Sequence, residues 1–199
     1  MSIYSSDNIL INAIIDNNDN SHKEIYRILY CNFSADIDVN AIRFKSATPL
    51  MLCAENGELD IVNLLIEYGA EINLFNNFGL NALMYATIKN HINIVALLLE
   101  NGSYIDKYNW YGKTALIMAS HYGYVHIVSL LLDKKANVNL YDNIHGNTAL
   151  MYAVQTKRIN IVRLLLDAGA DINIPDKLGK TVSMYASEND NKELIALLK

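Results

Sequence analysis

The sequence has few cysteines and no hydrophobic run long enough to cross a membrane. Cys31 and Cys53 are the only cysteines among 199 residues, and neither their number nor their spacing fits a disulfide framework or a metal site. We expect both to be free, apolar side chains on helices. Since no apolar stretch approaches the ~20 residues of a membrane span, we expect no membrane partner.

The first residues lack the pattern of a signal peptide. Met1 to Asn12 contain no basic segment followed by an apolar run. We therefore expect a cytoplasmic protein. A secreted effector that uses an unconventional export signal would have the same composition, and this alternative stays open.

Residue patterns that carry catalysis are missing as well. No Gly-rich loop precedes Lys-Ser or Lys-Thr, and Gly-x-Ser-x-Gly is absent. Among the five histidines, His121 and His126 lie five residues apart, which is the wrong spacing for one helix face. We therefore expect no catalytic residues, no metal and no other cofactor, and we predict that the protein is not an enzyme.

The charge balance disfavours a nucleic-acid partner. The formal net charge is −5, and a phosphate backbone calls for a positive surface. The negative charge is concentrated in residues 1–100, which carry 5 Lys and Arg against 12 Asp and Glu. This acidic half favours solubility as its explanation, with a basic partner as the alternative.

What the chain does have is an internal repeat. Two landmarks recur with steps of 33, 33, 34 and 33 residues. They are Thr48, Asn81, Thr114, Thr148 and Thr181, and then Ile61, Ile94, Ile127, Ile161 and Leu194. A fixed period near 33 indicates a stack of repeats whose extended surface binds other macromolecules.

Each repeat has the signals of two short helices joined by a turn. The Thr at the first landmark is a favoured helix N-cap, and Pro49 follows one such cap at the first helical position. Gly57 and Gly123 suit a left-handed turn after the first helix. The second helix carries Ile-Val-x-x-Leu-Leu, an apolar stripe at helical spacing, and glycines such as Gly169 end it.

The combined motif resembles the ankyrin repeat. One repeat reads Gly146, Thr148-Ala149-Leu150, Ile161-Val162, Leu164-Leu165-Leu166, Gly169-Ala170 and Ile172-Asn173. The resemblance implies an all-α solenoid of helix-turn-helix repeats joined by β-turn or hairpin-like loops. It also implies a protein–protein interaction module whose loop tips and first helices form a concave binding face.

The repeat positions predict one solenoid domain, which we expect to be a monomer. Residues 1–45 are interpreted as a degenerate N-terminal capping repeat, with helices at about 8–17 and 21–31. Five repeats follow within residues 46–199. They span about 46–78, 79–111, 112–145, 146–178 and 179–199.

The chain departs from the family pattern at two kinds of position. Apolar residues replace the usual histidine after Thr-Pro-Leu, and we expect them to pack in the core: Met51, Met84, Ile117, Met151 and Met184. Non-glycine residues stand where the family has a left-handed glycine: Asn90, Lys135, Lys157 and Asp190. Asn tolerates that conformation, whereas Lys does so poorly, so Lys157 is expected to weaken its repeat.

The resemblance places the partner-binding residues on the tips and at the ends of the first helices. The predicted set is Phe78, Trp110, Tyr111, Lys113, His121, Tyr122 and His145. Trp and Tyr are enriched at binding hot spots, which makes Trp110 and Tyr111 the centre of the prediction. The alternative for Phe78 and Tyr111 is packing against neighbouring tips. Tyr85, Tyr152 and Tyr185 recur inside the first helix and are interpreted as structural.

The predicted function is recognition of a protein partner. Two alternatives stay open. One is an intracellular effector or inhibitor that blocks an enzyme with its tips. The other, to which the end of the sequence at Lys199 points, is a fragment of a larger multidomain protein.

Overall fold

The computed structural model describes residues 14, 40, 47–188 and 190–198. The chain divides into two compact units, Met1–Ser103 and Tyr104–Lys199. The helices expected at 8–17 and 21–31 lie outside the described residues apart from Ile14, which is helical and buried. The boundary at residue 45 between a capping repeat and five full repeats therefore stays a prediction.

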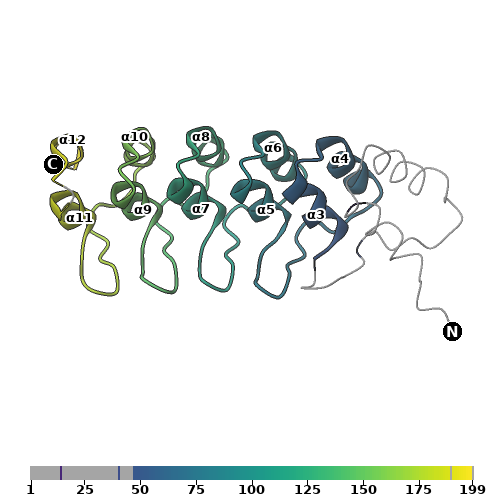
Figure 1. Ribbon diagram of the computed structural model, residues 1–199, viewed down its shortest axis with the longest axis horizontal. Helices are drawn as coiled ribbons and strands as arrows, with labels where there is room; N and C mark the ends of the chain where they lie inside the picture. Colours follow the sequence, from purple (N-terminus) through teal and green to yellow (C-terminus); the bar gives the residue numbers. More distant parts are fainter. Residues whose placement is uncertain (1–13, 15–39, 41–46, 189, 199) are drawn as a thin grey trace, which may run out of the picture. The chain divides into compact units, whose positions relative to one another are not determined.

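The first compact unit contains two helix pairs within its described residues. They are α3 (Pro49–Asn56) with α4 (Leu59–Glu67), and α5 (Ala82–Ile88) with α6 (Ile92–Glu100). The partners within each pair are in contact, α3 packs against α5, and α4 packs against α6. This is the expected helix-turn-helix arrangement (Figure 1).

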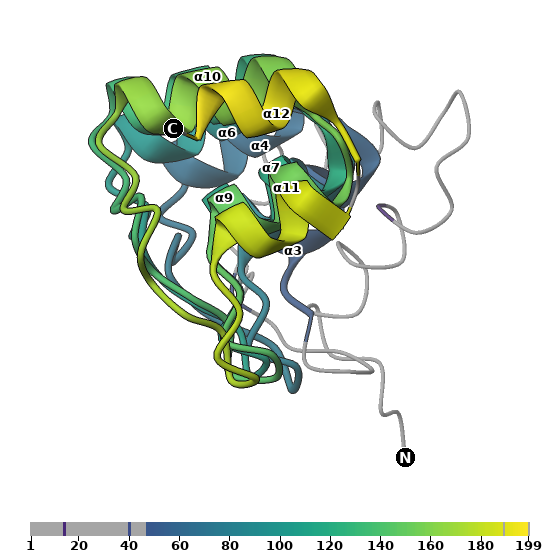
Figure 2. The ribbon, with the colours of Figure 1, turned by 90° about the vertical axis from the view of Figure 1, so that its left-hand side faces the viewer.

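The second compact unit continues the same pattern with three pairs. Its helices are α7 (Ala115–Tyr122), α8 (Val125–Asp133), α9 (Ala149–Gln155), α10 (Ile159–Asp167), α11 (Val182–Glu188) and α12 (Lys192–Leu197). First helices α7, α9 and α11 form one layer, and second helices α8, α10 and α12 form the other. Long loops extend beyond the first-helix layer, on the side away from the second helices (Figures 1 and 2).

The loops are hairpin-like, as expected. Isolated antiparallel bridges join Tyr108 to Thr114 and Tyr141 to Thr148, and they are the only β structure among the described residues. The all-α class and the hairpin-like connections are thereby confirmed. The five-residue excursion between Tyr108 and Thr114 is called a tip below, together with its equivalents at 76–80, 142–147 and 176–180.

Side-chain caps begin the first helices. The Thr48, Thr114 and Thr148 hydroxyls each accept a hydrogen bond from the backbone N–H three residues on, at 3.3 Å. Asn81 does the same through its side-chain oxygen at 3.0 Å. The landmark that set the 33-residue period is therefore a helix N-cap in these four repeats.

The second helices bury a narrower stripe than expected. In α8, for example, Ile127, Val128 and Leu131 are fully buried, whereas Leu130 is only partly buried. At 3.6 residues per turn, position i+4 falls between i and i+1 on the helix circumference, and position i+3 lies to one side of them. The side chain at i+3 therefore lies at the edge of the buried stripe and is partly exposed in α6, α8 and α10. It is buried only in α4, at Leu64.

The residues that replace histidine are buried in all but one repeat. Met51, Met84, Ile117 and Met151 are each 1% exposed, which confirms core packing, but Met184 is 51% exposed. In α3, α7 and α9 the next first helix packs alongside, whereas the described contacts of α11 are to α9 and α12. The prediction is therefore wrong for Met184, because no described helix covers that face of α11. Exposed Ser183 stands there in place of the buried leucine of other repeats, such as Leu150, and limits the apolar area that meets water.

Four non-glycine residues adopt the left-handed backbone, at the positions expected from the sequence. The φ angles are 62° at Asn90, 67° at Lys135, 58° at Lys157 and 48° at Asp190. Gly57 and Gly123 occupy the equivalent turn in α3–α4 and α7–α8, both with φ of 87°. A left-handed Lys costs about 1–2 kcal/mol relative to its ordinary conformations, a cost that glycine avoids.

We predict that Lys157→Gly stabilises the protein by about 0.5–1 kcal/mol, because removal of the left-handed penalty exceeds the added entropy of the unfolded chain. Urea unfolding of the full chain measures the difference. Asn90→Gly is the matched control, since Asn90 occupies the equivalent turn between α5 and α6. Its gain in stability should be close to zero because Asn tolerates this backbone conformation. An equal gain at both positions would contradict the strain assigned to Lys157.

Candidate functional site

One acceptor side chain stands at the start of every described tip. Asn109 Oδ1 accepts from the backbone N–H groups of Tyr111 and Lys113, both at 3.0 Å. Asn76 makes the equivalent pair of bonds in the first compact unit, and Asp176 makes it in the last repeat. In each tip, a side-chain oxygen thus accepts the hydrogen bonds that the loop N–H groups would otherwise donate to water.

The longer tip between Tyr141 and Gly146 keeps this arrangement in a modified form. Asp142 Oδ1 accepts from the N–H groups of Ile144 and His145 at 2.7 Å, and Asp142 Oδ2 is 3.3 Å from the N–H of Asn147. The carboxylate, with two oxygens, therefore serves a loop with one more residue. Asp142 itself is fully buried.

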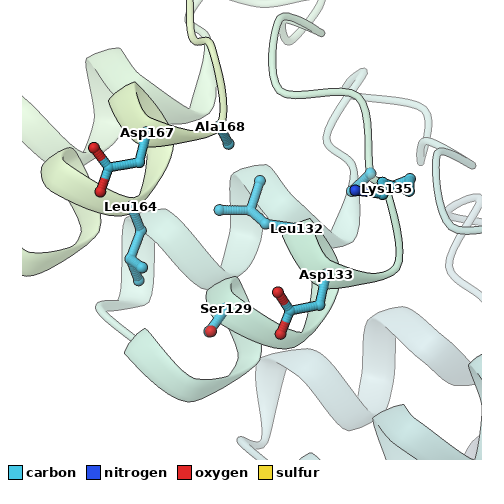
Figure 3. Close-up of a pocket in the computed structure, with 8 residues that line it drawn as sticks. Ser129, Leu132, Asp133, Lys135, Leu164, Asp167 and Ala168 are labelled. Atoms are coloured by element: carbon cyan, nitrogen blue, oxygen red, sulfur yellow. The ribbon is translucent and has the colours of Figure 1, made fainter.

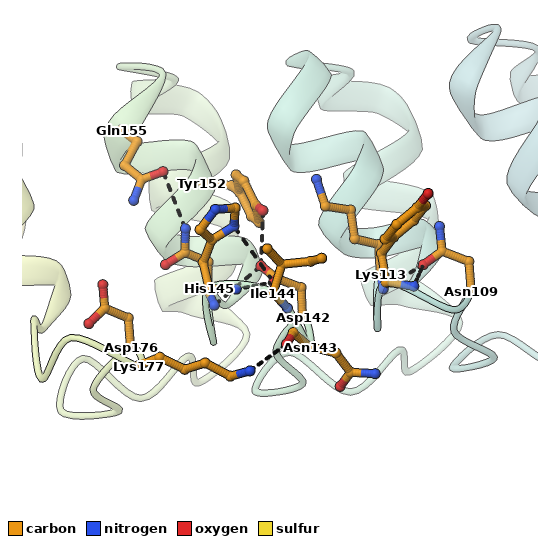
Figure 4. A network of polar contacts seen from close by, with 12 residues as sticks. Asn109, Lys113, Asp142, Asn143, Ile144, His145, Tyr152, Gln155, Asp176 and Lys177 are labelled. Carbon is orange, nitrogen blue, oxygen red and sulfur yellow. Dashed lines mark hydrogen bonds and ion pairs between the residues drawn. The ribbon is translucent and has the colours of Figure 1, made fainter. Parts of the chain in front are cut away.

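Tyrosines from the first helices complete three of these networks. The Tyr152 hydroxyl donates to Asp142 Oδ2 at 2.9 Å (Figure 4). The Tyr185 hydroxyl donates to Asp176 Oδ2. In the first compact unit the Tyr85 hydroxyl instead accepts from Asn76 Nδ2 at 2.9 Å. These contacts agree with the interpretation of the three tyrosines as structural.

Both carboxylates stay ionised well into the acid range. Burial alone would raise the pKa of Asp142, but hydrogen bonds from His145 N–H, the Tyr152 hydroxyl and Ile144 N–H outweigh it and lower the pKa. Asp176 also has a lowered pKa, because the Tyr185 hydroxyl and two loop N–H groups outweigh its burial. Conversely, the hydrogen bond to Asp176 and burial raise the pKa of Tyr185 to about 12. The two negative charges are therefore used inside the tips.

Trp110 and Tyr111 are exposed, as predicted for a binding surface. Trp110 is 64% exposed and Tyr111 is 51% exposed. The backbone of Tyr111 is bound by a neighbouring tip: its carbonyl accepts from the N–H of Asn143 at 2.8 Å. The carbonyl of His145 accepts from the N–H of Lys177 at the same distance, so the three tips of the second compact unit are tied together.

Two other predicted residues, Lys113 and His121, contact Tyr152, and a third, Tyr122, contacts His121. The Lys113 Nζ lies 4.7 Å from the centre of the Tyr152 ring. The His121 ring meets the same tyrosine edge-on at 5.0 Å and meets Tyr122 at 5.4 Å. Tyr122 in turn stacks on Tyr124 at 5.6 Å and keeps 45% of its surface exposed.

The last two predicted residues are His145 and Phe78. The side chain of His145 is 65% exposed, and its Nδ1 is 3.9 Å from the Asp142 carboxylate. Phe78 is 42% exposed and belongs to the first compact unit. The second compact unit therefore holds six of the seven predicted residues, and their role in binding stays a prediction.

An additional row of exposed aromatic residues was missed by the sequence reading. Phe75, Tyr108 and Tyr141 each come directly before the acceptor residue of a tip and are 52–57% exposed. Their positions repeat with the 33-residue period. That recurrence was the signal that could have revealed them, because aromatic residues that are regularly placed in loops have no core to fill.

The structure also shows a hollow on the second-helix side of the second compact unit. It has a volume of about 450 Å³ and lies between α8 and α10, where Leu132 and Leu164 face Asp133, Lys135 and Asp167 (Figure 3). Within the described residues, no three His, Cys, Asp or Glu side chains are grouped so as to hold a metal ion. None of the described helices has the length and apolar character needed to cross a membrane.

Comparison with protein families decides the family. The family model described as ankyrin repeats (3 copies) matches residues 10–109 and 105–176. The chain belongs to the ankyrin repeat family. Ankyrin repeats are generally protein–protein interaction modules.

A curated relative comes from fowlpox virus (strain NVSL), whose ankyrin repeat protein FPV244 is 44% identical over 50 residues. The matched stretch is 25% of this ankyrin repeat protein and 8% of the relative. The chain thus spans a small part of that relative's length.

We predict that Tyr152→Phe destabilises the protein by about 2 kcal/mol at pH 7, since the buried Asp142 carboxylate loses a donor. Tyr108→Phe is the matched control, because it makes the same change at an exposed tyrosine and should alter stability little. The lowered pKa of Asp142 means that its stabilisation is present above the ordinary Asp range and is lost as the pH falls through the folded-state pKa. The deficit of the variant, measured by urea unfolding, should therefore shrink in acid; a deficit independent of pH would argue against the carboxylate partner.

We also predict that protonation of His121 destabilises the folded chain. Burial, followed by the charges of Lys113 and Arg158, lowers the pKa of His121. The unfolded chain therefore takes up this proton first, and stability falls as the pH drops through and below about 6.5. Comparison of His121→Gln with the wild type by urea unfolding at pH 7.5 and 5.5 should show a smaller acid-induced loss in the variant. Equal losses would assign the effect to other groups.

Proposed function

We propose that this ankyrin repeat protein binds a protein partner through the tip surface of its second compact unit. The tip surface is defined as the exposed side chains of Trp110, Tyr111, Ile144, His145 and Leu178 together with the partly buried Lys113. The observation that carries the proposal is the exposure of Trp110 and Tyr111 side by side on one tip. Large aromatic side chains of this kind supply much of the binding energy at protein interfaces.

The way the tips are held supports the proposal. Each tip of the second compact unit is closed by its own acceptor side chain, and backbone hydrogen bonds join it to the next tip. Little loop entropy is therefore lost when a partner binds, so more of the contact energy appears as affinity. The exposed aromatic rings can vary without loss of these bonds.

The proposal includes a monomeric, cytoplasmic protein without enzymatic activity and without a nucleic-acid partner. The net charge of −5 and the lack of a catalytic motif in the sequence support the last two points. His121 and Tyr122 lie at the end of α7 and are proposed as a second patch beside the tip surface. Phe78, on the first compact unit, is proposed as a separate contact.

We predict that the double variant Trp110→Ala, Tyr111→Ala loses its partner while keeping its fold. Affinity capture from the native host's lysate, quantified by mass spectrometry, should recover the partner with the wild-type chain and at least about tenfold less with the variant. The helical circular dichroism signal should be unchanged, because neither side chain is buried.

Tyr104→Ala is the matched control. Tyr104 is 65% exposed, about as much as Trp110, but it lies outside the tips. It should capture the partner as the wild type does. Equal recovery by the double variant and the control would remove Trp110 and Tyr111 from the proposed site.

A further inference from the structure

A hollow on the tip surface has walls that suit one kind of side chain. It lies between the tips 142–147 and 176–180 and has a volume of about 320 Å³. Ile144 and Leu178 line it from the tips, and Tyr152 and Tyr185 line it from α9 and α11. Leu178 is 82% exposed, so apolar surface at the rim is left in contact with water. This size and lining fit a single large apolar side chain better than a charged group.

One buried polar atom in the wall lacks a partner. Asn147 lines the hollow and is 4% exposed, and its Oδ1 has no hydrogen-bond partner among the described residues. The surrounding network fixes which end of the amide this is. The Tyr152 hydroxyl gives its one proton to Asp142, so the amide NH₂ of Asn147 must face Tyr152 and the Gln155 oxygen, 3.5 Å away. The atom left over is an acceptor, which a donor from a bound group would satisfy.

Two lysines near the hollow, of which Lys177 lines it and Lys113 does not, carry positive charge without compensation. Lys113 lies over the ring of Tyr152, and the Lys177 ammonium donates to the carbonyl of Asn143; no described carboxylate lies within ion-pair distance of either lysine. The nearby carboxylates of Asp142 and Asp176 are buried and accept bonds from the tips themselves. Exposed Glu188 is held by Lys180 at 2.6 Å.

We propose that the hollow receives a tryptophan or tyrosine side chain from an acidic segment of the partner protein. The ring packs against Ile144, Leu178 and the two tyrosines, and its single N–H or O–H donates to Asn147 Oδ1. Acidic residues on either side of the ring pair with Lys113 and Lys177. The inference rests on the proposed function and adds the chemistry of the partner to it.

A nucleic acid is the competing polyanion, since basic and aromatic side chains together also bind single strands. The structure favours the protein segment for two reasons. The hollow offers an acceptor that a stacked base does not require. Only Lys177 in its lining and Lys113 beside Tyr152 are free of described carboxylates, whereas a phosphate backbone is bound by many cations.

Titration of the ¹⁵N-labelled full chain with synthetic peptides at low salt tests the proposal. The probe is an eleven-residue peptide of alternating Glu and Gly with one central Trp. It should shift the amide signals of Ile144, Tyr152 and Leu178 in a saturable manner. Replacement of the peptide's Trp by Phe should weaken binding about fivefold through the lost hydrogen bond, and replacement of every Glu by Lys should abolish binding.

Protein variants locate the site. Lys177→Glu should weaken the acidic peptide about tenfold, because it turns an attraction into a repulsion at the rim. Lys134→Glu, at the end of α8 and outside the tips, is the matched control with the same charge change and should weaken binding at most about twofold. Leu178→Ala should also weaken binding. Because Leu178 is 82% exposed, we expect this variant to keep its fold, which circular dichroism checks directly.

Several results would overturn the proposal. They are the absence of saturable shifts, shifts confined to Trp110 and Tyr111, equal effects of the two lysine variants, and tighter binding of a single-stranded oligonucleotide of the same charge. None of them would contradict partner capture that depends on Trp110 and Tyr111, so failure of the acidic-segment proposal is distinguishable from failure of the proposed function.

Discussion

The order of the tips, and with it the proposed binding surface, depends on one hydrogen-bond acceptor at the start of each tip. A loop that projects from a helical layer has backbone N–H groups with no helix or sheet to satisfy them. Asn76, Asn109, Asp142 and Asp176 satisfy these groups from inside the loop, which leaves the outward side chains free of structural duties. Bulky aromatic residues can therefore occupy the tips without any loss of backbone order. The third of these loops, 142–147, can hold an additional residue because the Asp142 carboxylate has two oxygens that accept hydrogen bonds.

Much of the fold could be predicted because the repeat signals are local. The helix caps, the left-handed turns and the hairpin-like loops each depend on a few neighbouring residues, and these recur in several repeats. Burial could be predicted less well, since it depends on what the next repeat covers. Leu130 and Met184 were expected in the core, and both are partly exposed because no described helix packs over them fully.

The site could be predicted only in part. Trp110 and Tyr111 were placed on an open tip from the motif alone, and they are exposed. The grouping of Lys113 and His121 around Tyr152 brings together three segments from two repeats, and no sequence spacing reports how such side chains turn. The unpaired oxygen of Asn147 could not be predicted from the sequence either. It is unpaired because the Tyr152 hydroxyl donates its proton to the Asp142 carboxylate.

The inward carboxylates change how the acidity of this chain should be understood. The isoelectric point of about 5.5 includes Asp142 and Asp176 as though their carboxylates were accessible to a binding partner. Both carboxylates accept hydrogen bonds inside the loops. An approaching molecule therefore meets lysines at this face, although the protein as a whole is acidic. The net charge of the chain is thus a poor guide to the sign of the electrostatic potential at this face. Electrophoresis or ion-exchange chromatography would suggest a basic binding partner, which is the wrong class for this face.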